Sequence, residues 1–275
     1  MSWLAVRVAG ASGATRDAIA AALIDAGAAC VQEERDDLIT YLPDDAPLDA
    51  VRGAIANDRG VVLELREASA TEVDRPWVST VGISRAGRFV VAPPWLDVEA
   101  AAGQTVIVID PAMAFGTGEH PTTRGVLRLM DGVVEPGDRV ADLGAGSAVL
   151  AIAAARLGAS RVAAIEMDPD AIGNAEQNVR VNAVGDRVVV IEGDAETILP
   201  HVAPVRVVLA NIISSVLIPL LPLARRSLEP GGAAIFSGIL VDERDEFVSA
   251  LEGDGWRVEG EHIEDVWWTT VARPA

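Results

Sequence analysis

The residues most capable of chemistry in this sequence are two glycines and two acids with regular spacing. Asp142, Gly144 and Gly146 are each separated by one residue, and Glu166 follows Gly146 by 20 residues. A glycine turn leaves backbone N–H groups bare beside a ligand. An acid at the tip of the next strand can accept hydrogen bonds from the vicinal hydroxyls of a ribose. The pattern therefore predicts a site for a nucleoside.

The apolar residues around this pattern predict the elements that position it. Residues 140–143 are typical of a strand buried on both faces, and Leu150–Leu157 has helical spacing. A second strand over 162–165 delivers Glu166, and Asp168, followed by proline, is expected to cap the next helix. This order predicts a doubly wound α/β domain that binds its ligand at the carboxyl ends of parallel strands.

The glycine pattern has to be distinguished from a dinucleotide fingerprint. A dinucleotide site requires a third glycine where this sequence has Val149, which disfavours an oxidoreductase. The acid-x-G-x-G pattern instead resembles the class I S-adenosylmethionine-dependent methyltransferases, whose cofactor has a ribose but no phosphate. A glycine turn in an unrelated α/β domain stays open as an alternative.

A second stretch of interest is the polar segment 110–124. It holds two glycines, two prolines and several hydroxyl and charged groups, which indicate a functional loop. Thr122 or Thr123 is expected to cap the helix that follows. His120 is a weak candidate for a base, and the three histidines of the chain share no ligand spacing, so no metal site is expected.

Two more polar residues are expected where strands end. Asp194 follows a strand over 188–191, where it could accept from an adenine amino group or serve as a plain loop acid. Asn211 ends a strand over 205–210, at the edge where ligands of open α/β sheets bind. It is therefore a candidate for the chemistry, with a cap for the following helix as the alternative.

The chain is expected to contain two domains. Residues 1–66 have the order β-α-β-β-α-β, which predicts a ferredoxin-like domain. Residues 67–100 are interpreted as a linker with one strand, Phe89–Ala92, and residues 101–275 as the larger domain. Its last two strands are closely spaced, so we expect them to be antiparallel.

Composition limits the classes of partner. The 275 residues carry a formal net charge of −19, and all 22 basic residues are arginine. Such acidity disfavours nucleic acid and suits a basic protein. Acids at 33–45 crowd around one predicted hairpin, as a solvated face or as a docking surface. Neither a signal peptide nor a membrane span is expected, which favours a cytoplasmic protein, and we expect a monomer.

Four segments together resemble one family. They are FGTGEHPTTR (115–124), VADLGAGSAVLAIAAARLGASRVAAIEMDPDAI (140–172), VLANII (208–213) and FSGIL (236–240). These segments are similar to the PrmA family, the methyltransferases of ribosomal protein eleven of the large subunit. The resemblance covers nearly the whole chain. It implies a seven-stranded, Rossmann-like methyltransferase domain with a small ferredoxin-like substrate domain, and S-adenosylmethionine-dependent methylation of amino groups.

The resemblance also implies roles for particular residues. It implies that Thr123, Gly144, Glu166 and Asn211 contact the cofactor. We add further cofactor-site candidates from the motifs and strand ends: Phe115, Gly116, Asp142, Gly146 and Asp194. Thr117 and Asn211 are implied to orient the acceptor amine. Two residues depart from the family pattern: Ala148 replaces the third glycine, and Glu166 replaces the usual aspartate. A methyltransferase for a small molecule stays an alternative, which the N-terminal domain disfavours.

Overall fold

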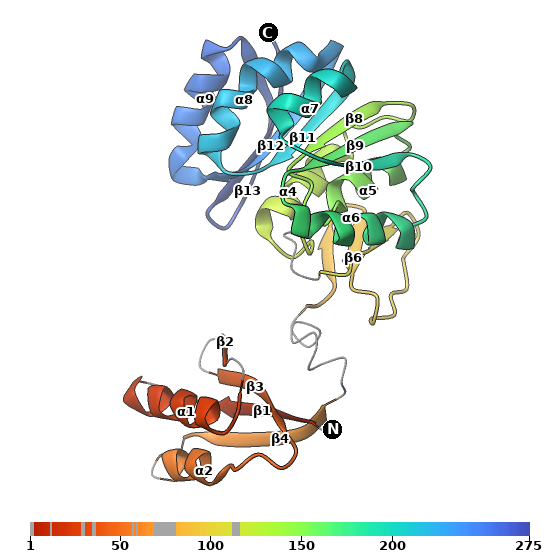
Figure 1. Cartoon of the computed structure of the whole chain (residues 1–275). Coiled ribbons are helices and arrows are strands. Elements are labelled where there is room, and N and C mark those ends of the chain that lie inside the picture. The colour runs from red at the N-terminus through yellow and green to blue at the C-terminus, as the bar shows by residue number, and fades with distance from the viewer. Residues whose placement is uncertain are drawn as a thin grey trace. The chain divides into compact units, whose positions relative to one another are not determined.

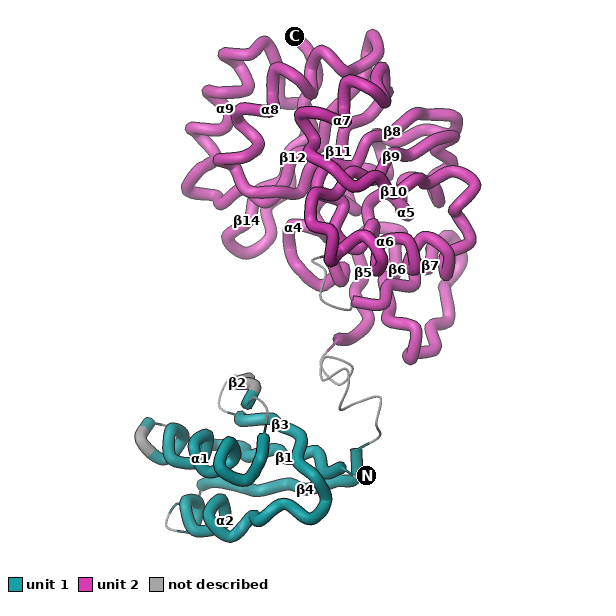
Figure 2. Tube along the Cα trace, viewed as in Figure 1, with its two compact units in different colours: residues 1–80 teal, residues 81–275 magenta. Residues whose placement is uncertain are grey.

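The structure, a computed structural model, forms two compact units, Met1–Thr80 and Val81–Ala275 (Figure 2). It describes residues 3–275 except 12, 29–30, 35–36, 57, 59, 69–80 and 112–115, and it leaves out the side chains of 14 and 32–34. The side chains of Phe115 and of three acids expected on the N-terminal hairpin, Glu33, Glu34 and Asp36, lie outside the described residues. Each unit is described by itself.

The first unit is a four-stranded antiparallel sheet with two helices. Its elements are β1 (Trp3–Ala9), α1 (Gly13–Asp25), β2 (Gln32–Glu34), β3 (Asp37–Pro43), α2 (Asp49–Ile55) and β4 (Val62–Ala68). The strand order β2-β3-β1-β4 is that of a ferredoxin-like fold, as the sequence predicts. Strand β3 alternates between buried and half-buried side chains, because one sheet face packs against the helices. On the other face Arg7 pairs with Asp37 at 2.6 Å.

The second unit is built on a seven-stranded sheet of order β10-β9-β8-β11-β12-β14-β13 (Figure 1). The strands are β8 (Arg139–Leu143), β9 (Arg161–Glu166), β10 (Val188–Glu192), β11 (Val205–Asn211), β12 (Leu228–Leu240), β13 (Trp256–Glu264) and β14 (Trp267–Pro274). Only β14 runs against its neighbours, and it forms the expected antiparallel pair with β13. The strand order reverses between β8 and β11. Ligands of open α/β sheets bind at the carboxyl ends of the strands beside such a reversal.

Helices cover both faces of this sheet. One face packs against α4 (Pro121–Met130), α5 (Val149–Arg156) and α6 (Pro169–Val181). The other face packs against α7 (Ala195–Val202), α8 (Ser214–Ser227) and α9 (Arg244–Gly253). Neighbouring residues of β8 enter opposite cores, since Val140 packs with the first group and Ala141 with the second. No described helix is long and apolar enough to cross a bilayer.

A small three-stranded sheet completes the second unit. It consists of β5 (Ser84–Ala86), β6 (Phe89–Ala92) and β7 (Thr105–Val108), with β6 parallel to β7. Residues 84–92 fall within the stretch interpreted from the sequence as a linker, but their pairing with β7 makes them part of this unit. A side chain binds the edge of β7: Asn182, the residue after α6, accepts a hydrogen bond from Val108 N–H and donates one to the Val108 carbonyl.

Candidate active site

The glycine turn after β8 adopts backbone conformations that favour glycine. Gly144 has φ +68° and Gly146 has φ +52°. The N–H groups of Gly144 and Ala145 donate to Ile165 O at 2.9 and 3.0 Å, which anchors the turn to β9. A Cβ on Gly144 would lie 2.6 Å from Ile212 Cγ2. The turn therefore leaves no room for a side chain at the position where a ligand has to approach the backbone.

Glu166 closes the other side of this turn. Its Oε2 accepts from Gly146 N–H at 2.7 Å, and its Oε1 accepts from the N–H groups of Met167 and Asp168, each at 2.9 Å. The acid predicted at the tip of β9 thus lies beside the glycine turn. Asp168 caps α6 by accepting from Asp170 N–H, as expected.

Asp142 supports the turn from within the protein. Its Oδ2 accepts from Ala151 N–H at 3.0 Å in the first turn of α5, and its Oδ1 is buried with no partner among the described groups. Burial raises the pKa of Asp142 to about 7, against the effect of the Ala151 bond, and the charge of Glu166 adds to the rise. Asp142 does not line the cavity described below.

Ala148 has the left-handed conformation, with φ +65°. Its methyl is completely buried and belongs to the hydrophobic core. Ala148 departs from the family pattern by one methyl, and this residue does not line the cavity. The backbone conformation explains why the family pattern has glycine at this position, because a Cβ is unfavourable at this φ.

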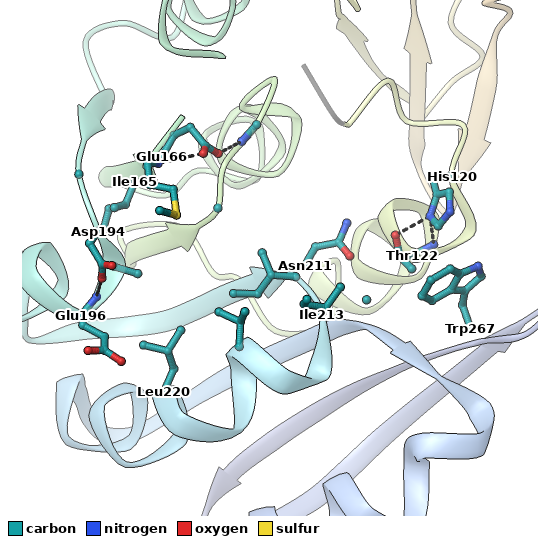
Figure 3. A pocket seen from close by; sticks show the side chains of 18 residues that line it. His120, Thr122, Ile165, Glu166, Asp194, Glu196, Asn211, Ile213, Leu220 and Trp267 are labelled. Carbon is teal, nitrogen blue, oxygen red and sulfur yellow. Dashed lines mark hydrogen bonds between the residues drawn. The ribbon is translucent and has the colours of Figure 1, made fainter. Parts of the chain in front are cut away.

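A cavity of about 550 Å³ opens at the carboxyl ends of the parallel strands. One side is formed by the glycine turn with Glu166, Met167 and Asp194, and the other by Asn211, His120 and Trp267 (Figure 3). Its remaining walls are mostly aliphatic. Its volume lies within the range of small-molecule sites, and its few polar groups converge from separate strands.

Asn211 belongs to the same side of the cavity as His120 and Trp267 (Figure 3). Its Nδ2 donates to Thr123 Oγ1 at 3.3 Å, while its Oδ1 is buried with no partner among the described groups. The alternative role as a helix cap is wrong, because α8 begins after Ile213 and has no side-chain cap. Thr123 itself is buried and does not line the cavity.

His120 and Trp267 form the far end of the cavity. His120 is the N-cap of α4, and its Nδ1 accepts from Thr122 N–H, so the cap predicted at Thr122 or Thr123 is wrong. The rings of His120 and Trp267 pack edge to face, with centroids 5.0 Å apart. Burial, and then the charge of Arg124, lower the pKa of His120, which favours a neutral imidazole at pH 7.

An ion cluster holds this end of the site in place. Arg124 Nε donates to Glu264 Oε1 at 2.7 Å, and Arg128 pairs with Glu264 Oε2, which ties α4 to β13. Partial burial raises the pKa of Glu264, but hydrogen bonds from Arg124, Arg128 and His262 lower it to about 2. The described residues contain no cluster of His, Cys, Asp or Glu that could hold a metal.

The structure divides the predicted residues into two groups. Those that line the cavity are Gly144, Gly146, Glu166, Asp194 and Asn211. Those that do not line it are Gly116, Thr117, Thr123 and Asp142, while Phe115 is outside the described residues. The sequence interpretation missed Met167, Ile213 and Trp267. Only Met167 has a sequence signal, its position directly after the acid of β9.

The sheet order, with one antiparallel strand, and a cavity at the reversal of strand order define a class I methyltransferase fold. The profile of the family described as "Ribosomal protein L11 methyltransferase (PrmA)" matches residues 77–274. The chain belongs to this family.

Relatives and a solved structure support the assignment. A "Ribosomal protein L11 methyltransferase" from Chloroflexus aurantiacus is 36% identical, over 86% of this chain and 81% of that protein. One from Pelotomaculum thermopropionicum is 39% identical, over 85% of this chain and 78% of that protein. A crystal structure of "ribosomal protein L11 methylase" from Lactobacillus delbrueckii subsp. bulgaricus is 28% identical with a TM-score of 0.63, covering 70% of this chain and 98% of that one.

The protein is therefore an S-adenosylmethionine-dependent methyltransferase. The cavity fits this cofactor, because the glycine turn offers bare backbone where a Cβ would collide with Ile212. Glu166 offers carboxylate oxygens beside the turn, and the buried Oδ1 of Asn211 has no partner among the described groups. These groups suit a ligand with a ribose diol and a cationic amino-acid portion.

Proposed function

We propose that this protein methylates amino groups of ribosomal protein L11 of the large ribosomal subunit, at lysine side chains or at the N-terminus. The observation that carries the proposal is the two-sided cavity, which has nucleoside-type groups on one wall and Asn211, His120 and Trp267 on the other. Support for the substrate comes from the names of relatives that align with most of the chain.

We assign the cofactor wall to residues at the tips of three strands. Gly144 and Gly146 present backbone to the cofactor, Glu166 accepts from its ribose hydroxyls, and Asp194 accepts from its adenine amino group. Asp194 is exposed and caps α7 through one oxygen, Oδ1, which accepts from Glu196 N–H at 2.6 Å. Its other oxygen is left for a ligand.

We assign the acceptor side of the site to Asn211, which lines the cavity, and to the loop around Thr117, which lies outside its lining. When bound, S-adenosylmethionine supplies an electrophilic methyl group on a sulfonium. A lysine amine has a pKa of about 10.4 in water, so it must lose a proton before it attacks. The mostly apolar cavity disfavours the ammonium form. Asn211 Oδ1 can accept a hydrogen bond from the amine and direct its lone pair, which is an orienting role.

Thr123 and Asp142 act indirectly in this proposal. Thr123 fixes the amide of Asn211 through their hydrogen bond at 3.3 Å. Asp142 holds α5 against the glycine turn through Ala151. Neither is required to touch the cofactor, which modifies the roles implied by the family resemblance.

The partner and the setting are part of the same proposal. A net charge of −19 favours a basic protein as substrate and disfavours direct binding of nucleic acid. We infer that the first unit holds the protein substrate, and that the enzyme works as a cytoplasmic monomer. A small-molecule acceptor is the second candidate, because the cavity alone has a size that suits such ligands.

Incubation with labelled S-adenosylmethionine and purified ribosomal proteins tests the proposal. We expect label on ribosomal protein L11, located at amines by mass spectrometry. The enzyme contains no lysine, so its own side-chain amines give no background. Transfer to no ribosomal protein, with intact cofactor binding, would leave the small-molecule alternative.

A further inference from the structure

The loop Gly116–Gly118 packs directly against two other segments. Gly116 has φ +103°, and a Cβ built on it would lie 2.8 Å from Ser147 Oγ. Gly118 has φ +87°, and its Cβ would lie 2.7 Å from Val91 Cγ1. The loop backbone thus rests on the glycine turn on one side and on β6 on the other. Both glycines are required by this close approach and by their φ angles.

Two serines donate hydrogen bonds to the carbonyl groups of the residues on either side of Thr117. Ser147 Oγ donates to Gly116 O at 2.7 Å, and Ser84 Oγ donates to Gly118 O at 2.6 Å. Ser147 is completely buried and Ser84 is 7% exposed. Since buried carbonyl groups need a partner, each hydroxyl satisfies a loop carbonyl that no helix or strand would pair.

Ser147 is itself held rigidly. Its carbonyl accepts from Asn178 Nδ2 at 3.1 Å, and Asn178 Oδ1 accepts from Asp110 N–H at 2.9 Å. The preceding residue is Gly146, whose N–H donates to Glu166. A continuous series of bonded groups therefore runs from the acid on the cofactor wall through the glycine turn to Gly116.

Ser84 is held by the small sheet. It pairs in register with Val91, the residue that Gly118 packs against. Two residues earlier, Gly82 N–H donates to Glu119 Oε1 at 2.9 Å, so the end of the loop is bonded to the same segment. The stretch interpreted as linker thus includes one of the two supports of the loop.

We propose that Ser147 and Ser84 are positioning residues for the acceptor side of methyl transfer. They fix the backbone on both sides of Thr117, and through it the place of the acceptor amine. This inference rests on the proposed function, in which the loop around Thr117 holds the amine. Neither serine lines the cavity. Ser84 belongs to the small sheet, so its effect on the acceptor is separable from cofactor binding, whereas Ser147 directly follows Gly146 of the glycine turn.

Variants that differ only in the hydroxyl isolate this role. Ser84→Thr keeps the hydroxyl, and Ser84→Val has nearly the same shape as Ser84→Thr but lacks the hydroxyl. Ser147→Ala removes the other hydroxyl. Ser160→Ala is the matched control, because Ser160 Oγ donates to Gly137 O at 2.7 Å, outside the residues that line the cavity.

Three measurements on the full chain test the proposal. The first is the affinity for S-adenosylmethionine by calorimetry, and the second is the single-turnover rate of methyl transfer to purified ribosomal protein L11. The third is amide hydrogen exchange at Thr117 and Gly118 in the free enzyme. Because small misplacements of reacting groups can cost about a hundredfold, we expect Ser147→Ala and Ser84→Val to lower the rate by about ten- to a hundredfold.

The expected pattern is specific. In Ser84→Val the cofactor affinity should change less than about threefold, and in both loop variants exchange at Thr117 and Gly118 should accelerate. Ser84→Thr and Ser160→Ala should match the wild type. Equal losses of affinity and rate, or unchanged exchange, would overturn the proposal. If the wild type transfers no methyl to the ribosomal protein, the proposed function fails, and the exchange data alone then decide whether the serines fix the loop. If Ser147→Ala does not fold, the Ser84 pair decides.

Discussion

Glu166 Oε2 accepts a hydrogen bond from Gly146 N–H at 2.7 Å, which joins the tip of β9 to the glycine turn after β8. Glutamate is one methylene longer than the aspartate expected at this position, and the added length gives the carboxylate a longer reach toward the turn. With its bonds to Met167 and Asp168, the carboxylate accepts three backbone N–H groups. A carboxylate has about four acceptor positions, so a ribose diol shares this group with the turn.

We predict that Glu166→Gln weakens the binding of S-adenosylmethionine. The substitution removes the charge-assisted bonds to the ribose, and we expect a loss of about 1.5–3 kcal/mol, or roughly ten- to a hundredfold in Kd. Calorimetry measures this. Glu192→Gln is the control, because Glu192 pairs with Glu166 in register on β10 and does not line the cavity. Equal affinities for wild type and Glu166→Gln would remove Glu166 from the cofactor site.

Ala148→Gly is predicted to change the stability by less than about 0.5 kcal/mol and to leave cofactor affinity within about threefold. An alanine in the left-handed region costs about 1–2 kcal/mol, but the greater entropy of unfolded glycine and the loss of a buried methyl, worth about 0.8 kcal/mol, offset this relief. Denaturant unfolding measures it. Ala183→Gly should instead gain about 0.5–1 kcal/mol, since Ala183 has φ +50° and its methyl is exposed. A large gain in affinity would instead place the Ala148 methyl against the ligand.

Much of the fold could be predicted from the sequence because its signals are local. Apolar runs and glycine turns are sufficient to locate β8, β9 and β11, and the residues at their ends follow from sheet geometry, which brings Glu166 and Asn211 to one cavity. Trp267 could not be predicted, since its place depends on the long-range pairing of β14 with β12. The same holds for β5, whose place in the second unit depends on its pairing with β6 and on the bond from Ser84 to Gly118.

Residue roles were harder to predict than residue positions. An acid at position 142 is expected at the ligand, yet Asp142 caps α5, because Ala148 at the N-cap has no side-chain acceptor. His120 likewise takes the cap expected at Thr122 or Thr123, since α4 begins at Pro121. In each case the residue type allows more than one role, and the packing around the helix start decides which role it takes.

Asn211→Ala should lower the methyl-transfer rate more than the cofactor affinity. Its Oδ1 has no partner among the described groups, and its Nδ2 is used by Thr123, so the free oxygen is available to orient an amine. Loss of one orienting hydrogen bond in a fixed site can cost roughly a hundredfold in rate. Single-turnover kinetics and calorimetry on the same samples separate the two effects. Parallel losses would make Asn211 a cofactor contact only.

The stability of the protein is predicted to fall between about pH 4 and pH 7 through Asp142. An unfolded aspartate has a pKa of about 3.9, and burial raises that of Asp142 to about 7. The folded state therefore binds more protons than the unfolded chain in this range, so a rise in pH favours unfolding. Asp142→Asn cannot ionise and should lack this contribution. The melting temperature of Asp142→Asn minus that of the wild type should therefore increase from pH 5 to pH 8. A difference that stays constant with pH would contradict the prediction.

The last prediction concerns the first unit as a docking module. A fragment of residues 81–275 contains every cavity residue and both sheets of the second unit. We expect it to fold and to bind S-adenosylmethionine with the affinity of the full chain.

The same fragment should methylate a protein acceptor much more slowly. A tethered module presents its partner at an effective concentration of about millimolar, and its removal abolishes this advantage without changing the chemistry. The defect should be in KM for ribosomal protein L11, while the rate at saturating acceptor stays close to that of the full chain. If the acidic first unit attracts a basic partner, a raised salt concentration should also raise the KM of the full chain for ribosomal protein L11. Methylation by the fragment at the KM of the full chain would show that the first unit does not dock the substrate, and would favour the small-molecule alternative for the cavity.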